Sequence, residues 1–343
     1  MTVEEFISEW NNNNDCVSVR TSGSTGVPKQ IWVEKRRMEE SARITCDFLG
    51  LKSGDTALLC MSPDYIAGKM MIVRSLVRNL NLTVVEPSGH PLAAISHMQT
   101  ANAGQSEPIK PFTFAAMVPM QVYNSLQVAG ERELLMSIQH LIIGGGAIDD
   151  TLADELKDFP NAVWSTYGMT ETLSHIALRR LSGAEASQWY TPFESVEVSL
   201  NNENCLVIDA PLVCGERLTT NDIAELAADG RRFRIIGRKD NVICSGGIKI
   251  QIEEVERLLH SHLPAPFAIS KCKDAKFGEA VVLVTEDEDL AVAHAVCERI
   301  LPKYWRPRHY LHVSSIPLTA TGKLARAEIE HLAAEANRIS ILP

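Results

Sequence analysis

Positive charge is scarce in this chain of 343 residues: 33 lysines and arginines stand against 43 aspartates and glutamates, giving a formal net charge of −10. An acidic chain is a poor nonspecific ligand for nucleic acid, whose phosphates must be neutralised by lysine and arginine. We therefore expect no nucleic-acid partner. The balance also means that any site for a phosphorylated ligand must gather positive groups locally.

Long apolar runs are missing as well. The two longest uncharged stretches, Pro87–Ser106 and Pro111–Gly130, are interrupted by proline, glutamine, asparagine and serine, which is not typical of a membrane span. The segment Met1–Trp10 has neither the basic start nor the apolar centre of a secretory signal. The eight cysteines are scattered without a Cys-x-x-Cys pair, which favours reduced thiols. We therefore expect a cytoplasmic protein without a membrane span.

What is present is the composition of a folded protein, with 45% apolar and 22% charged residues. Up to residue 166, short apolar strand patterns alternate with glycine loops and helical spacing, which predicts a layered α/β fold. After about residue 195 short strands with polar turns predominate, and a compact α+β segment follows. The sequence thus predicts a larger domain over residues 1–238 and a small α+β domain over residues 239–343, hinged near residue 240.

The strongest local signal is the segment from Thr21 to Lys29. Its glycines free the backbone to wrap an anion, its hydroxyls donate hydrogen bonds, and its lysine adds charge. It is not a Walker A loop, because Val27 and Pro28 separate the last glycine from the lysine. A flexible surface turn has a similar composition and remains the alternative. The candidate phosphate-binding residues are Thr21, Ser22, Gly23, Ser24, Thr25, Gly26 and Lys29.

Two further segments follow apolar strands. Glycines in Gly144–Ala147 would admit close approach by a ligand at a helix start, with a tight strand-to-helix connection as the alternative. The loop Thr166–Thr172 lies at the end of a strand, where ligands collect in α/β folds. In it, Tyr167 would stack on a base and Glu171 would offer a hard oxygen to Mg²⁺. The alternative is a plain helix start with Thr170 as its N-cap.

Residues later in the chain are weaker signals by themselves. Asp222 is expected in a turn, and Arg238 with Asp240 in a surface ion pair. Lys323 is expected to be a solvated lysine where a turn leads into a helix. The basic and aromatic run Lys303–Arg308 is expected to be a solvated face, with contact to a nucleotide phosphate as the alternative.

In this order and spacing the segments resemble the adenylate-forming superfamily, which includes acyl-CoA synthetases, luciferases and nonribosomal-peptide adenylation domains. The resemblance covers positions 20 to 325. Within the acyl-CoA synthetase branch, Tyr167–Thr172 followed by Ser174-His175 is most similar to the short o-succinylbenzoate–CoA ligases of menaquinone synthesis. The matching segments are Thr21–Lys29, Gly144–Ala147, Tyr167–Glu171, Asp222, Gly237-Arg238, Gly246-Gly247 and Thr321-Gly-Lys323.

The resemblance implies an enzyme that joins a carboxylic acid, here an aromatic one, to coenzyme A in two half-reactions. The carboxylate attacks the α-phosphate of Mg·ATP and gives an acyl-adenylate and pyrophosphate. The small domain then rotates, and the thiol of coenzyme A attacks the acyl carbon and expels AMP. The resemblance thus implies ATP, Mg²⁺ and coenzyme A as cofactors or co-substrates, and a small carboxylate as the substrate.

The family roles carry over by matching position. Ser22–Gly26 and Lys29 would hold the β- and γ-phosphates, and Lys323 would reach the α-phosphate during adenylation only. The catalytic set is Lys323, Thr170 at the α-phosphate and Glu171 at Mg²⁺. The residues that would frame the adenine are Gly144, Gly145, Gly146, Ala147 and Tyr167, followed by Gly168 and Met169. Those implied for the ribose are Asp222 and Arg238. The implied hinge is Asp240, and the thiol channel is Gly246, Gly247 and Lys249, with Lys249 facing water as the alternative.

The chain also departs from the family pattern. Only residues 1–20 precede the phosphate loop, so part of the sheet and of the acyl pocket is expected to be absent, with a homodimer partner or a more open pocket in its place. Tyr65 stands where relatives often have histidine, and the acyl-pocket candidates are Tyr65, Ser174 and His175. A second carboxylate on the substrate would need a positive residue, for which Arg179 and His175 are the nearest candidates.

Two other functions remain open at this point. One is a non-catalytic ATP-binding relative, and the other is a stand-alone adenylation enzyme that loads a carrier protein.

Overall fold

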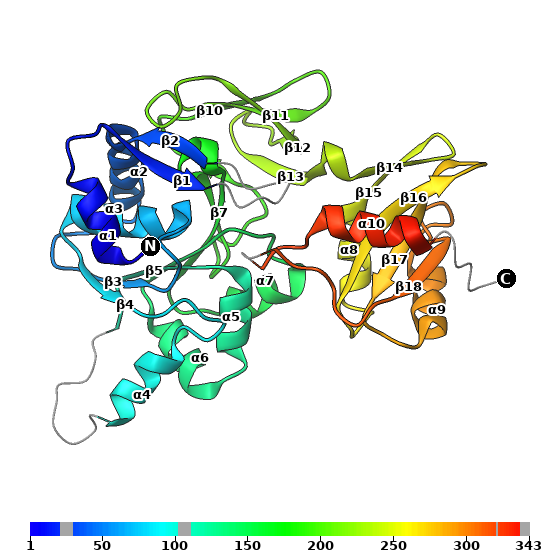
Figure 1. Ribbon diagram of the computed structural model, residues 1–343, viewed down its shortest axis with the longest axis horizontal. Coiled ribbons are helices and arrows are strands. Elements are labelled where there is room, and N and C mark those ends of the chain that lie inside the picture. Colours follow the sequence, from blue (N-terminus) through cyan, green and yellow to red (C-terminus); the bar gives the residue numbers. More distant parts are fainter. Residues whose placement is uncertain (21–29, 102–110, 320–321, 337–343) are drawn as a thin grey trace.

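The computed structural model describes residues 1–20, 30–101, 111–319 and 322–336. Figure 1 shows two lobes: the chain up to Arg238 builds the N-terminal lobe, and the chain from Val242 onward builds the C-terminal lobe. The short 3₁₀ helix η2 (Lys239–Asn241) joins them. The predicted boundary between residues 238 and 239 therefore coincides with the end of a strand. That it separates two domains that move independently stays a prediction.

A seven-stranded sheet forms the centre of the N-terminal lobe, in the order β4-β3-β5-β6-β7-β8-β9. The pairs from β4 to β7 are parallel, and β8 and β9 add antiparallel strands at one edge. Parallel strands end at the same edge, so the loops after β5, β6 and β7 lie together there. The strands are β3 (Thr56–Leu59), β4 (Asn81–Val84), β5 (Phe114–Met117), β6 (His140–Ile143), β7 (Ala162–Gly168), β8 (His175–Arg180) and β9 (Thr191–Pro192).

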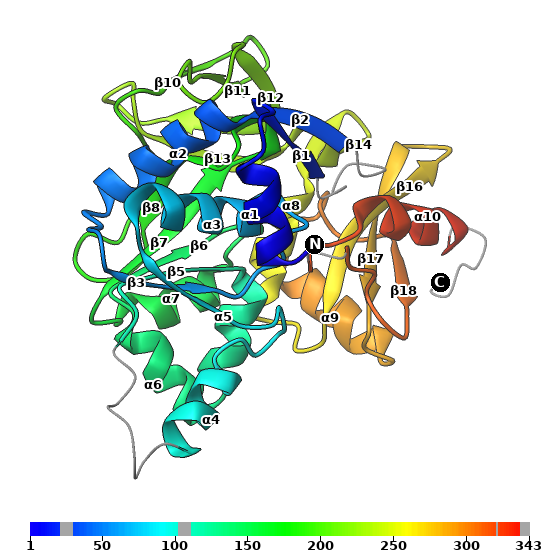
Figure 2. The same ribbon diagram turned by 60° about the vertical axis from the view of Figure 1, so that its left-hand side comes forward.

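Helices cover both faces of this sheet, because successive side chains of a strand point to opposite faces. Leu59 and Ile142 pack in the core beneath α2 and α3, while Leu58 and Leu141 pack beneath α4 to α7. Figure 2 shows α2 and α3 on one side of the strands and α5 to α7 on the other. The helices of this lobe are α1 (Val3–Trp10), α2 (Lys35–Phe48), α3 (Ile66–Arg78), α4 (Ala93–Ala101), α5 (Pro119–Leu126), α6 (Ala129–Ser137) and α7 (Asp150–Lys157).

Two antiparallel units complete the N-terminal lobe. β1 (Cys16–Arg20) pairs with β2 (Gln30–Glu34), one on each side of segment 21–29. A four-stranded sheet in the order β10-β11-β12-β13 follows the main sheet. Its strands are β10 (Glu197–Leu200), β11 (Cys205–Asp209), β12 (Leu218–Leu226) and β13 (Phe233–Arg238).

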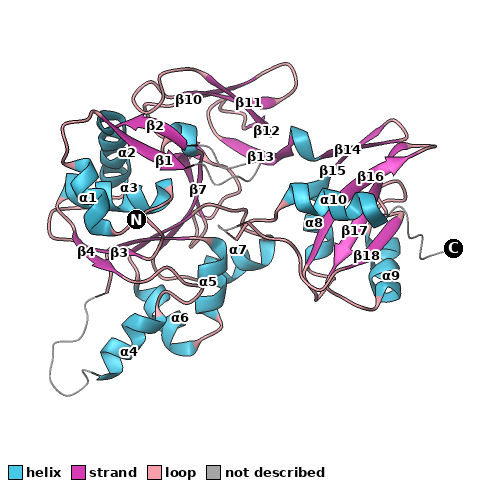
Figure 3. Ribbon diagram, viewed as in Figure 1, coloured by secondary structure: helices cyan, strands magenta, loops and turns pink. Residues whose placement is uncertain are grey.

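The C-terminal lobe is a sheet covered by helices on both faces (Figure 3). Its strand order is β15-β14-β17-β16, and β18 pairs in parallel with β17. Helices α8 and α9 pack on one face, and α10 packs on the other. The elements are β14 (Val242–Ser245), β15 (Ile248–Gln251), α8 (Ile252–His260), β16 (Phe267–Asp274), β17 (Gly278–Thr285), α9 (Leu290–Ile300), β18 (His309–His312) and α10 (Arg326–Ala336).

The predicted α/β class is confirmed, and the largest gap in the sequence-based prediction lies between residues 87 and 139. That stretch contains α4, β5, α5 and α6. All four residues of β5 are buried, so the strand shows no alternation of polar and apolar residues. Among the described residues, no helix combines the length and the apolar character that a membrane crossing requires.

Candidate active site

The loops at the carboxyl edge of the main sheet bring together two of the predicted segments. Gly144 follows β6 directly, and a Cβ at this position would collide with the hydroxyl of Thr166 on β7. Helix α7 begins a few residues later, where the Asp149 side chain accepts a hydrogen bond from the Leu152 backbone at 2.8 Å. The strand–glycine–helix arrangement that the sequence predicted is therefore present, next to the end of β7.

The loop after β7 differs from the predicted helix start. Thr170–Thr172 is a short 3₁₀ helix, and its cap residue is Met169, whose backbone N–H donates to the Thr172 hydroxyl at 3.0 Å. The alternative that was left open for this loop, a plain helix start with Thr170 as its N-cap, is therefore wrong. Its hydroxyl is consequently not committed to capping. Gly168 is required at the strand end, because a Cβ there would collide with the backbone of Ser174 and His175.

Glu171 is exposed in this loop, and its carboxylate has no partner within the ranges that the structure describes. A single carboxylate beside bound phosphates is a usual way for proteins to hold Mg²⁺, which retains waters and takes phosphate oxygens as further ligands. No group of three or more potential metal ligands occurs among the described residues. Glu171 is thus suited to be the one protein ligand of a Mg²⁺ ion whose other ligands are phosphate oxygens and water.

Asp222 links three parts of the N-terminal lobe. The Tyr167 hydroxyl donates to one of its carboxylate oxygens at 2.6 Å, and Arg238 donates to the other at 3.2 Å. The expectation that Asp222 lies in a turn was wrong: it lies within β12, directly opposite Arg238 on β13. The strand register therefore holds the two residues that were predicted at the ribose side by side.

Tyr167 is fixed by its ring as well as by its hydroxyl. Its ring packs edge-on against Phe233 at 5.1 Å between centroids, and against Tyr190 at 5.8 Å. Burial and the adjacent Asp222 raise the pKa of Tyr167 well above its usual range. The phenol therefore stays protonated and keeps donating to Asp222. This arrangement presents a rigid aromatic group beside the carboxylate.

Lys323 of the C-terminal lobe is turned toward the same region. Burial and the positive charge of Arg238 lower the pKa of Lys323 below its ordinary value. Its ammonium has no anionic partner in the described parts of the chain. The neighbouring Gly322 approaches Met120 at the start of α5, where a Cβ would lie 3.8 Å from the sulfur. The fold thus brings Lys323 and the Asp222–Arg238 pair to one region, ready for an anion.

The connection between the lobes is tied to this region. Asp240 accepts hydrogen bonds from Asn221 at 3.1 Å and from Arg238 at 3.0 Å. Gln251 of the C-terminal lobe donates to the backbone carbonyl of Arg238 at 2.9 Å. A rotation about Asp240 would therefore disturb the contacts of Arg238. The hinge role of Asp240 stays a prediction that these contacts support.

The predicted channel residues lie on the C-terminal lobe. Gly246 and Gly247 form the turn between β14 and β15, and the turn packs against Phe277. Lys249 is exposed on β15, opposite Cys244. Their contact with coenzyme A stays a prediction.

A buried polar chain lies where the acyl pocket was predicted. Arg74 on α3 donates to the Ser174 hydroxyl at 2.6 Å, which lies 3.2 Å from Nδ1 of His175. Nε2 of His175 lies 3.0 Å from the hydroxyl of Thr45, which donates to the Ser41 carbonyl. With His175 neutral and protonated on Nε2, every contact pairs a donor with an acceptor. Burial and the Arg74 charge lower the pKa of His175 well below its ordinary value, so His175 does not supply the positive charge that was expected.

The buried positive charge beside Ser174 and His175 is that of Arg74, which the sequence analysis missed. It is only 2% exposed, and its Nε has no hydrogen-bond partner among the described residues. Burial lowers its pKa to about 10, so it remains charged at neutral pH. An arginine in the middle of an apolar helix was the available signal, since buried arginine is rare unless it is paired. Tyr65, the third acyl-pocket candidate, is the N-cap residue of the same helix. Arg179, the other candidate for the positive charge, lies over the ring of Tyr190.

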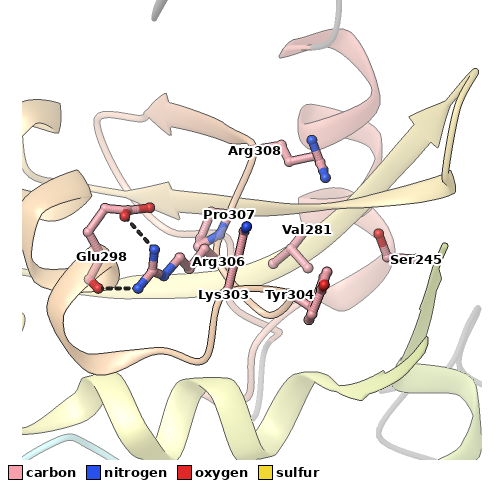
Figure 4. A pocket seen from close by; sticks show the side chains of 8 residues that line it. All are labelled: Ser245, Val281, Glu298, Lys303, Tyr304, Arg306, Pro307 and Arg308. Carbon is pink, nitrogen blue, oxygen red and sulfur yellow. Dashed lines mark hydrogen bonds and ion pairs between the residues drawn. The ribbon is translucent and has the colours of Figure 1, made fainter.

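A separate basic cavity lies on the C-terminal lobe (Figure 4). It has a volume of about 260 Å³, and Arg306 is held at its edge by Glu298 at 2.5 Å. Lys303 and Arg308 have no ion pair within the described ranges, and the Arg308 guanidinium lies 3.8 Å from the ring centre of Phe277. The residues that line the cavity are Ser245, Val281, Glu298, Lys303, Tyr304, Arg306, Pro307 and Arg308.

The predicted phosphate loop lies outside the described residues. This applies to Thr21, Ser22, Gly23, Ser24, Thr25, Gly26 and Lys29. Their roles stay predictions.

Comparison with protein families gives a match over residues 5–216 to a family described as AMP-binding enzyme. Among curated proteins, the 2-succinylbenzoate–CoA ligase of Bacillus cereus (strain AH820) is 25% identical over 348 residues, covering 92% of this chain and 70% of the relative. The enzyme of the same name from Enterococcus faecalis is 26% identical and covers 89% of this chain and 67% of the relative.

Solved structures show the same similarity. An AMP-forming acyl-CoA synthetase/AMP-acid ligase II-like protein from Dyadobacter fermentans is 32% identical with a TM-score of 0.62, covering 97% of this chain and 93% of the other. The o-succinylbenzoate–CoA synthetase of Bacillus subtilis, solved with its acyl-adenylate intermediate, has a TM-score of 0.74 at 21% identity. That match covers 91% of this chain and 68% of the synthetase and supports the fold.

Proposed function

Because this chain belongs to the AMP-binding enzyme family, we propose that it is an AMP-forming ligase that joins a carboxylic acid to coenzyme A through an acyl-adenylate. The observation that carries the proposal is that Lys323 of the C-terminal lobe is partly buried near Arg238, which pairs with Asp222 and, through Asp222, with Tyr167. Lys323 belongs to one lobe, and the residues proposed for the base and the ribose of ATP belong to the other. A lysine in this position is suited to a reaction at a phosphate that is bound between the two lobes.

The chemistry requires stabilisation of negative charge more than proton transfer. A carboxylate attacks the α-phosphate, the bond to the pyrophosphate breaks, and a mixed anhydride forms. Lys323 would stabilise the developing charge, and Thr170 would donate to the α-phosphate. Asp222 and Arg238 would hold the ribose, and Tyr167 with Gly144–Ala147 would frame the base. Mg²⁺, held by Glu171, would supply neutralisation of the phosphate charge.

For the acid we propose an aromatic dicarboxylate, o-succinylbenzoate, as in menaquinone synthesis. Arg74 supports this choice, because a buried guanidinium with an unpaired N–H is suited to a second carboxylate. The names of the Bacillus and Enterococcus relatives support the same substrate. A cytoplasmic location and a homodimer belong to this proposal as well.

A pyrophosphate-release assay over a panel of aromatic and aliphatic acids tests the function. We expect ATP- and Mg²⁺-dependent release with o-succinylbenzoate and a clearly weaker signal with monocarboxylates. ATP binding without release for any acid would favour a non-catalytic ATP-binding protein instead. Parallel reactions with coenzyme A and with a pantetheinylated carrier protein identify the acceptor, because a carrier-loading enzyme would use only the second.

We place the phosphates of coenzyme A at the basic cavity of the C-terminal lobe. Lys303 and Arg308 offer unpaired positive charge there, and Tyr304 is 65% exposed and free to stack on an adenine. Arg308→Ala is expected to raise the KM for coenzyme A about ten-fold with adenylation unchanged. Initial rates of thioester formation measure this, with Arg299→Ala as a control on an exposed arginine outside the lining. An unchanged KM in Arg308→Ala would contradict the placement.

A further inference from the structure

Arg326 anchors the segment that carries Lys323 to the rest of the C-terminal lobe. Its two terminal nitrogens donate to the two carboxylate oxygens of Glu256, each at 2.7 Å. Arg326 also donates to the carbonyl of Ile269 at 3.1 Å, and Glu256 accepts from the Ile269 backbone N–H at 2.8 Å. The pair thus joins α8, β16 and the start of α10. Glu256 and Arg326 are 17% and 24% exposed, so water weakens this pair less than an ordinary surface ion pair.

The Arg326 end of the Glu256–Arg326 pair lies close to Lys323 along the chain. Arg326 is three positions after Lys323. Backbone hydrogen bonds tie Lys323 and Ala325 into a loop with residues that precede them: Thr319 donates to the Lys323 carbonyl at 2.7 Å, and Ala325 donates to the Pro317 carbonyl at 2.9 Å. One end of the loop is therefore held by the Glu256 contact. A shift of Arg326 would be transmitted to Lys323 through a short, hydrogen-bonded path.

Helix α8, which carries Glu256, also contacts the N-terminal lobe. Arg257 lies 3.6 Å from Asp150, and His260 lies 3.7 Å from Asp149, both at the start of α7. Figure 1 shows α7 and α8 on facing sides of the two lobes. The same helix therefore holds the Lys323 segment on one side and meets the element that follows Gly144–Ala147 on the other. Exposed pairs of this length contribute little energy by themselves, so the stronger effect is expected from Glu256.

We propose that Glu256 is a positioning residue for Lys323: through its paired hydrogen bonds to Arg326, it fixes the lysine segment where adenylation needs it. This inference rests on the proposed function, because Lys323 is assigned to the adenylation half-reaction only. The Glu256–Arg326 pair lies within the C-terminal lobe and stays formed in either orientation of that lobe. Its catalytic effect should nevertheless be confined to the half-reaction that uses Lys323.

The test compares the two half-reactions in Glu256→Gln and Arg326→Lys. Glu256→Gln keeps the size of the side chain but removes its charge, and Arg326→Lys keeps the charge but removes the paired geometry. We expect acyl-adenylate formation to fall about ten- to hundred-fold in both, as for displacements of about 1 Å in a catalytic group. Thioester formation from supplied acyl-adenylate should stay within about two-fold of wild type.

Glu279→Gln is the matched control. Like Glu256, Glu279 pairs with a basic residue of the same lobe and accepts a hydrogen bond from a backbone N–H. Its partners are Lys271 at 3.1 Å and the N–H of Cys244 at 2.6 Å, and neither belongs to the Lys323 segment. Its adenylation rate should equal that of wild type. Equal losses in both half-reactions, an unchanged adenylation rate, or failure of both Glu256 and Arg326 variants to fold would overturn the proposal in favour of a purely structural pair. A wild-type protein that forms no adenylate would instead contradict the proposed function.

Discussion

Lys323→Ala is expected to lower the rate of acyl-adenylate formation about 100- to 1,000-fold, which is the usual effect of removing one preorganised group that stabilises transition-state charge. Thioester formation from supplied acyl-adenylate should remain close to wild type. The physical reason is that Lys323 has no anionic partner among the described residues, lies within the electrostatic influence of Arg238, and is needed only when charge develops at the α-phosphate. If the lobe rotates about Asp240 as the resemblance implies, Lys323 would be turned away in the second half-reaction.

Single-turnover assays measure each half-reaction separately. Pyrophosphate release reports adenylation, and coenzyme A consumption with synthetic acyl-adenylate reports thioester formation. Lys323→Arg tests whether positive charge alone suffices. Equal losses in both half-reactions would count against a lysine that serves only one orientation of the lobes.

The lowered pKa of Lys323 gives this prediction a pH dependence. Burial and Arg238 favour the neutral amine, so the proton is lost at a lower pH than the ordinary lysine value of 10.5. Adenylation needs the charged form of Lys323. As the pH rises, kcat/KM for ATP should therefore begin to fall at a pH below 10.5, and this profile reports the pKa of Lys323 in the free enzyme. The alkaline limb should be absent in Lys323→Arg, since arginine keeps its charge.

The sequence predicted well those features that depend on neighbouring residues. The apolar strand that was expected before Gly144–Ala147 is β6, and the helix start that was expected there is that of α7, which has Asp149 as its N-cap. Asp222 was misplaced, because a polar residue between short strand patterns is typical of a turn. Only the pairing of β12 with β13 shows that Asp222 is opposite Arg238. Such pairing joins segments far apart in the chain, which local patterns do not report.

Arg74 was missed for a related reason. Its chemistry depends on Ser174, which lies one hundred positions later in the chain and is brought into contact with Arg74 only by the fold. From sequence alone, Arg74 and Arg78 are two basic residues on one helix. The structure separates them: Arg78 pairs with the carboxylate of Asp47 near the surface, whereas Arg74 is 2% exposed and its charge has only the neutral Ser174 hydroxyl and the Met71 sulfur as partners among the described residues. The two arginines differ in burial and not in residue type, and burial is not evident from the local sequence.

Arg74→Met is expected to lower kcat/KM for o-succinylbenzoate about 30- to 5,000-fold, because a buried carboxylate loses its charged partner at a cost of about 2 to 5 kcal/mol. Methionine fills most of the space and avoids a large cavity. The loss should be specific to the second carboxylate, so the ester of the carboxylate that is not activated should be used equally by variant and wild type. The ratio of the two kcat/KM values therefore isolates the interaction from any general effect on folding.

Arg78→Met is the matched control, since it removes the same group four positions along the same helix but leaves Arg74 in place. Its preference for the diacid over the monoester should equal that of wild type. If Arg74→Met lowers activity on the diacid and the monoester alike, the arginine supports the Ser174–His175 chain and not the substrate. If neither substrate is affected, the second carboxylate is bound elsewhere. Only a loss that is confined to the diacid agrees with the proposed role of Arg74. In that role its guanidinium is buried, charged and incompletely paired because its partner is the second carboxylate of the substrate.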